Sequence, residues 1–141
     1  MTPLEQLKTR INRNGDINDP ATVRPLVSLE EFFEGNDDAG SIGYNLPDPP
    51  KPSEFYTLFK EIRNRKNVSD VLVEVLDQSM PDEWPSAETV WIISSAPADV
   101  VSTWLPEEFA ADDVWDGWTD HIKREPYDVP PGMKAIGLWW D

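Results

Sequence analysis

The chain has 141 residues, 39% of them apolar, which is enough for one domain with one hydrophobic core. It has no Cys and no run of about 20 apolar residues, which excludes disulfides, thiolate metal sites and a membrane-spanning helix. The net charge is −15, and residues 67–141, with 16 acidic and 3 basic groups, contribute −13. This charge repels nucleic acid and anionic membranes and attracts basic proteins and metal cations, although solubility alone also explains it.

The first 24 residues are predicted to form an arm outside a single domain of residues 25–141. Leu4, Leu7 and Ile11 share one face of a short helix, and the following residues are rich in Asn, Asp and Gly, as is typical of a loop. The N-terminus lacks the basic start and apolar centre of a signal peptide. Together with the absence of Cys, this favours a cytoplasmic protein of bacterial type.

Residues 26–34 fit two structures. In a strand, Val27 and Phe33 would share a face with Leu29. In a helix, Ser28 would be the N-cap and Glu31 would occupy the capping-box position.

The next segment, G-N-D-D-A-G at residues 35–40, is typical of a turn, after which residues 41–45 could return as the second strand of a hairpin. The alternative is a site for a hard cation, which needs several oxygen ligands from one loop. The spacing does not match an EF-hand, so a turn in which Asn, Asp and Gly serve the backbone is favoured. The candidate metal ligands are Glu34, Asn36, Asp37 and Asp38.

A helix is predicted over residues 54–66, capped by Ser53 and preceded by a proline-rich break. Its acidic start and basic end complement the helix dipole. An apolar stripe at helical spacing faces a core and consists of Phe55, Leu58, Phe59 and Ile62.

Two apolar, β-branched runs at residues 70–77 and 88–95 predict neighbouring antiparallel strands at the centre of a sheet. Val71, Val73 and Val75 point to one face in the first run. Both faces of each run are mostly apolar, so both faces should be covered. The linking segment contains two prolines, which prevents either strand from continuing through it.

A short helix is predicted over residues 97–105, with Pro97 in its first turn. An acidic segment with two tryptophans follows, where a helical turn around Phe109 leads into a loop. Aromatic rings within an acidic rim can bind a cationic partner, whereas the alternative, which is favoured, is that both rings fill the core beneath a loop. The candidate partner-binding residues are Asp112, Asp113, Trp115, Asp116 and Trp118.

Residues 134–140 alternate as a closing strand, so removal of residues 134–141 should unfold the domain. The predicted class is therefore α+β, a mostly antiparallel sheet with helices packed on it. The order of elements suits a ferredoxin-like split βαβ core, and a two-layer sandwich is the alternative.

Catalytic motifs are sparse. His121 is the only His, and the sequence has no nucleophile elbow, phosphate-binding loop or dinucleotide fingerprint, so we expect no cofactor. Ser94 and Ser95 at a strand end are favoured as caps of the next helix. Carboxylate pairs for glycoside chemistry stay open, because sequence does not give their separation.

Four stretches, "LEEFFEGN", "GSIGYNL", "DVLVEV" and "LWWD", make the chain resemble an uncharacterised family of small acidic bacterial proteins. The resemblance covers most of residues 24–141 and implies no established activity. Size and charge also resemble those of immunity proteins that neutralise toxins. The favoured function is a non-enzymatic binding protein for a basic protein partner, and the alternative is a divalent-cation-binding module or cation-dependent enzyme.

Overall fold

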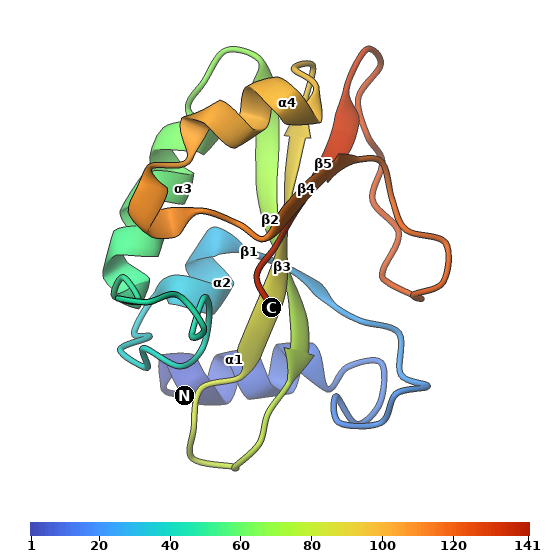
Figure 1. Ribbon diagram of the computed structural model, residues 1–141. Coiled ribbons are helices and arrows are strands. Elements are labelled where there is room, and N and C mark those ends of the chain that lie inside the picture. Colours follow the sequence, from blue (N-terminus) through green and yellow to red (C-terminus); the bar gives the residue numbers. More distant parts are fainter.

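A computed structural model describes all of residues 1–141 and confirms the α+β class. Five strands form one antiparallel sheet in the order β1-β2-β3-β5-β4, and the helices lie on one face of it (Figure 1). None of the helices combines the length and the apolar character that a membrane span requires. The strands are β1 (Leu26–Ser28), β2 (Val68–Asp77), β3 (Ser86–Ser94), β4 (Asp113–Asp116) and β5 (Lys134–Trp139). The helices are α1 (Pro3–Ile11), α2 (Leu29–Phe33), α3 (Pro52–Arg63) and α4 (Ala98–Val101), followed by 3-10 turns η1 (Ser102–Trp104) and η2 (Glu107–Phe109).

The central strand pair has the predicted pairing. β2 and β3 are antiparallel neighbours, and Val71, Val73 and Val75 all point into the main core beneath the helices. Leu72 points to the opposite face, where it joins a second, smaller cluster with Trp91. Because side chains alternate along a strand, the two apolar faces of the sequence become two separate cores.

The strand order excludes the ferredoxin-like arrangement. A split βαβ unit places another strand between the two parallel strands that its helix connects. Here β1 lies at the edge of the sheet and pairs directly with β2 in an antiparallel register. The sheet is a meander-like layer covered by helices on one side.

Both structures predicted for residues 26–34 occur, one after the other. β1 ends at Ser28, whose hydroxyl caps α2 by accepting from the Glu31 amide, while the Glu31 carboxylate accepts from the Ser28 amide. The predicted return strand at 41–45 is wrong, because that segment forms turns. Ser41 instead accepts from the Ala87 amide and gives β3 a single backbone contact.

Helix α3 begins two residues before the predicted position. Pro52 is its first residue, and Lys51 rather than Ser53 is the N-cap. The Glu54 carboxylate accepts from the Lys51 amide, so it satisfies an amide at the helix start. The predicted apolar stripe is buried as expected.

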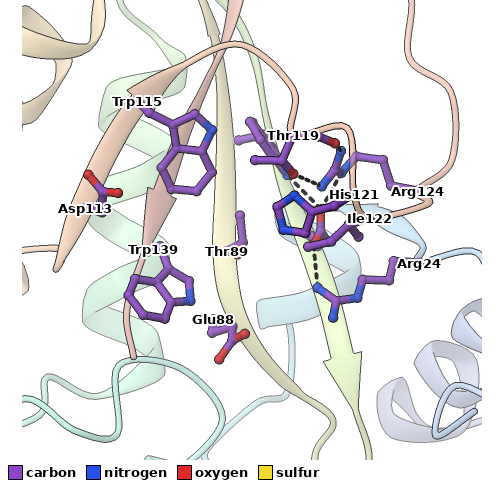
Figure 2. A pocket seen from close by; sticks show the side chains of 12 residues that line it. Arg24, Glu88, Thr89, Asp113, Trp115, Thr119, His121, Ile122, Arg124 and Trp139 are labelled. Carbon is purple, nitrogen blue, oxygen red and sulfur yellow. Dashed lines mark hydrogen bonds and ion pairs between the residues drawn. The ribbon is translucent and has the colours of Figure 1, made fainter. Parts of the chain in front are cut away.

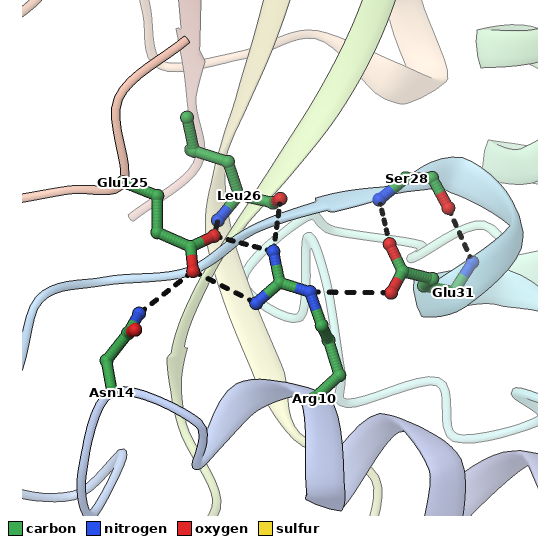
Figure 3. Close-up of polar contacts among 6 residues, drawn as sticks. All are labelled: Arg10, Asn14, Leu26, Ser28, Glu31 and Glu125. Carbon is green, nitrogen blue, oxygen red and sulfur yellow. Dashed lines mark hydrogen bonds and ion pairs between the residues drawn. The ribbon is translucent and has the colours of Figure 1, made fainter.

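The predicted N-terminal arm contributes side chains to the main core. Leu7, Ile11 and Ile17 are buried in it. Arg10 lies beside them and pairs with Glu125, whose carboxylate also accepts from Asn14 (Figure 3). The first residues are therefore tied to a segment more than 100 positions away.

A long connection, residues 117–133, covers the face of the sheet that carries no helix (Figure 1). It is held beside the N-terminal segment by a short parallel bridge between Arg24 and Arg124. The Tyr127 hydroxyl also donates to Asp70 of β2, and burial together with this carboxylate raises the pKa of Tyr127. The connection and the open sheet face enclose the site described next.

The last third of the chain differs from the prediction at one point. The predicted helix at 97–105 is α4 continued by η1, and β5 confirms the predicted closing strand. The segment predicted as a loop, however, contains strand β4, which pairs with β5. Its Asp-Val-Trp-Asp sequence is too short and too charged to stand out as a strand.

Candidate functional site

Strand β4 divides the predicted partner-binding residues between the two faces of the sheet. Asp113 and Trp115 are on the open face, where they border a pocket. Asp116 has the opposite parity, and its carboxylate accepts from the Ala98 amide at the start of α4 on the helical face. The predicted set therefore does not form one surface, although its binding role stays a prediction.

The two remaining members have structural contacts. The Asp112 carboxylate accepts from the Asp141 amide and the Asn45 side chain, and these hydrogen bonds lower the pKa of Asp112. Trp118 packs on Trp91 in the second core with ring centroids 4.6 Å apart. For Trp118, the structure thus agrees with the alternative in which the ring fills a core beneath a loop.

A pocket of about 480 Å³ lies between the open sheet face and residues 119–124 of the connection. Figure 2 shows Asp113, Trp115 and Trp139 on one side, and Arg24, His121 and Arg124 on the other. The remaining lining residues are Glu74, Glu88, Thr89, Trp91, Thr119 and Ile122. The pocket therefore has an acidic, aromatic end and a basic end.

The pocket is built on one row of side chains that crosses four strands. Glu74 of β2 lies opposite Thr89 of β3, Thr89 opposite Trp139 of β5, and Trp139 opposite Asp113 of β4. Neighbouring strands lie about 4.8 Å apart, so the row is about 14 Å long between the backbones of its end residues. The register of the sheet thus fixes the distance between the backbones of Glu74 and Asp113.

The basic end is organised by a buried carboxylate. Glu74 is only 2% exposed, and its oxygens accept from Arg24 at 3.0 Å, Arg124 at 2.7 Å and the Trp91 indole at 3.0 Å. A buried charge is tolerated only when it is paired and hydrogen-bonded, and this carboxylate has both forms of compensation. The network carries two positive charges and one negative charge.

Arg124 is held rigidly by its other contacts. Its remaining nitrogens donate to the Thr119 carbonyl at 2.8 Å and to the Thr119 hydroxyl at 2.6 Å. Its guanidinium also lies 5.0 Å from the centre of the Trp91 ring, within the range of a cation–π contact. Arg124 therefore belongs to the floor of the pocket.

The Trp115 indole can lie over β5 only because Gly137 has no side chain. A Cβ at residue 137 would overlap the indole of Trp115, which meets Trp91 edge to face at 5.5 Å. The Trp115 Nε1 is buried and has no acceptor in the chain, a cost that a Phe would avoid. A buried N–H group without an acceptor lowers the stability of the fold. Such groups are more common at functional positions than elsewhere.

The acidic end has carboxylates with no partner in the chain. Asp113 is exposed and Glu88 is half-buried, and neither side chain makes a hydrogen bond or ion pair. Figure 2 places both carboxylates near the Trp139 ring. This end is open to a cationic group, which both carboxylates and aromatic faces attract.

The loop predicted as an alternative cation site serves as a turn. Asp38 accepts from the Gly40 amide, and the Asn36 carbonyl oxygen accepts from the Asp38 amide. Asn36 also donates to Ser41 and is buried, so its amide oxygen does not face solvent. No group of three or more acidic or His side chains in the structure could hold a metal ion.

The sequence reasoning missed the residues at the basic end. A charged Glu74 inside an otherwise apolar strand is the one sequence signal that could have indicated this end, because such a residue needs a buried partner. Arg24 and Arg124 lie 100 positions apart in loops, and nothing in their local sequence indicates that they meet.

A family model described as "Uncharacterized protein YfbO family" matches residues 2–138. The chain is also 44% identical to "Uncharacterized protein YfbO" of Escherichia coli (strain K12), over the full length of both chains. No solved structure matches.

Proposed function

The chain belongs to the YfbO family of uncharacterised proteins, which agrees with the resemblance of its motifs to an uncharacterised bacterial family, and we propose that it is a non-enzymatic binding protein for a basic protein partner. A cationic side chain of the partner would enter the acidic, aromatic end of the pocket. The observation that carries this proposal is the pair of unpartnered carboxylates, Asp113 and Glu88, beside Trp139 and Trp115.

The chemistry of this end fits a Lys or Arg side chain. An ammonium or guanidinium over the face of a Trp gains a cation–π contact, which is stronger where water is partly excluded. The two carboxylates would supply opposite charge, and the indole surfaces would pack on the aliphatic stem of the side chain. The same arrangement would reject an acidic side chain.

The overall charge supports the same class of partner. A net charge of −15 attracts a basic protein over long distances and speeds association, while the half-buried aromatic residues supply affinity. This mode of action would be immunity- or inhibitor-like, in that a small acidic protein covers a basic one.

The test is a capture experiment from lysate of the source organism, at low and high salt, with three forms of the protein. The wild type and the control D128N, which changes an exposed carboxylate away from the pocket, are expected to retain the same basic partner. The double variant E88Q/D113N should lose it. If the double variant retains that partner as well as the wild type does, the proposed site is wrong.

A further inference from the structure

We propose that the occupant of the pocket is the C-terminal residue of the partner, a Lys or Arg with a free carboxylate. This inference rests on the proposed function and adds a role for the basic end. The side-chain cation would lie between Trp139 and Asp113, and the terminal carboxylate would bind Arg24.

Arg24 is the group with free donors. Only its Nη1 is used, in the 3.0 Å bond to Glu74, and no other nitrogen of its side chain has a partner in the chain. Its side chain is 27% exposed, and it lines the pocket. The free N–H groups of a guanidinium match the two oxygens of a carboxylate.

The surrounding network keeps Arg24 positively charged and in place. Glu74 is shared with Arg124, so one carboxylate balances two guanidinium groups and one positive charge remains. Arg124 is fixed by Thr119 and Trp91, which leaves the surplus charge available at Arg24. His121 lies at the same end of the pocket (Figure 2).

The length of the pocket selects one residue that carries both charges. The row from Glu74 to Asp113 is about 14 Å long between backbones, and Arg24 and Asp113 reach into it from opposite ends. An occupant that meets both ends must therefore carry its anion and its cation several bonds apart, as the terminal carboxylate and the side-chain cation of a Lys or Arg are. In the row, Trp139 lies between Thr89 and Asp113, where the end of the aliphatic stem would pack next to the cation.

Two related ligands fit less well. An internal Lys or Arg has an amide where the basic end offers a guanidinium, so it would leave Arg24 without an anion. A free basic amino acid has the carboxylate but also an α-ammonium, which would lie beside Arg24 and be repelled. The C-terminal residue of a protein has the carboxylate without that second cation.

The test uses N-acetylated Gly-Gly-Lys and Gly-Gly-Arg peptides, each with a free C-terminal carboxylate or a C-terminal amide. Binding is followed by tryptophan fluorescence at neutral pH, because the pocket contains Trp91, Trp115 and Trp139. We expect the acid peptides to bind about tenfold more tightly than the amides, the effect of one charge-assisted hydrogen-bond pair.

The variant R24Q should remove the difference between acid and amide while retaining weak binding of both. The matched control is R13Q, which changes an exposed arginine whose side chain makes no hydrogen bond or ion pair in the chain, and which should bind as the wild type does. Circular dichroism and the thermal midpoint of R24Q show whether it folds; if it does not, the comparison of acid with amide on the wild type decides alone.

Each outcome supports or overturns the inference. Equal affinity for the acid peptides and the amide peptides overturns the inference. The proposed function is tested separately, by the capture experiment with E88Q/D113N. Free lysine or arginine binding as tightly as the acid peptides overturns the C-terminal source. Failure of every peptide to bind at millimolar concentration also overturns the inference, whereas loss of partner capture overturns the proposed function itself.

Discussion

Gly137 of β5 lies directly beneath the indole of Trp115 on β4, in a space that no side chain could share with that ring. We therefore expect G137A to destabilise the protein by about 2 kcal/mol through overpacking. Chemical unfolding followed by circular dichroism would measure this.

The double variant W115A/G137A separates this clash from other effects. Once the indole is absent, G137A should cost nothing or stabilise the strand slightly, because Gly weakens a strand interior. Additive costs of the two substitutions would show that the two residues do not compete for the same space.

The ion pairs of Glu74 predict that removing the carboxylate and removing one guanidinium cost unequal amounts of stability. E74Q should cost about 3–5 kcal/mol, because it leaves two guanidinium groups, one of them only 8% exposed, without their anion. R24Q should cost less, since Arg124 and Trp91 still donate to Glu74. Urea unfolding of both variants would check the order, and a smaller loss for E74Q than for R24Q would contradict it.

Glu125 predicts how stability depends on pH. Burial raises the pKa of its carboxyl, but hydrogen bonds from Arg10, Asn14 and the Leu26 amide outweigh burial, so the folded-state pKa lies below the usual 4.5. A carboxyl with a lowered pKa contributes stability that is present above its unfolded-state pKa. This contribution is lost as the pH falls through the folded-state value.

The free energy of unfolding of the wild type should thus decrease as the pH falls below about 4.5, and E125Q should lose part of that slope. At neutral pH, E125Q should be about 2 kcal/mol less stable, because three donors lose a charged acceptor. If the free energy of unfolding falls equally steeply with pH in the wild type and in E125Q, Glu125 does not contribute to acid unfolding.

The C-terminal strand gives a fourth prediction. β5 lies between β3 and β4, so deletion of residues 134–141 removes the partner of both strands and exposes both cores. The truncated chain should show no cooperative thermal transition. Deletion of Asp141 alone, an exposed residue, is the matched control and should shift the midpoint by only a few degrees.

Local patterns accounted for most of the fold. The alternation of Val71, Val73 and Val75 and the apolar stripe of α3 each depend on a period that a sequence displays directly, and both were predicted. β4 was missed because its pairing with β5 stabilises it, while its own sequence has little strand propensity.

The site was less predictable than the fold, because it depends on tertiary contacts that no local sequence pattern displays. Trp115 and Asp113 were identified because they lie in an acidic segment with two tryptophans. Asp116 lies on the opposite face of the sheet because this segment forms β4, which the sequence did not reveal. The basic end depends on Arg24 and Arg124, which only the tertiary structure brings together.

The shared carboxylate also imposes an order on folding. The β2–β3 pair is local in sequence and can form early, but Glu74 on its surface stays hydrated until Arg24 and Arg124 arrive from positions 50 residues before and 50 residues after it. We therefore expect the second core to close only after the segments that carry Arg24 and Arg124 have docked. In partly folded chains the hydrated charge of Glu74 would stand among the apolar side chains of this sheet face, and such an inward-pointing charge discourages the sheet-to-sheet association that leads to aggregation.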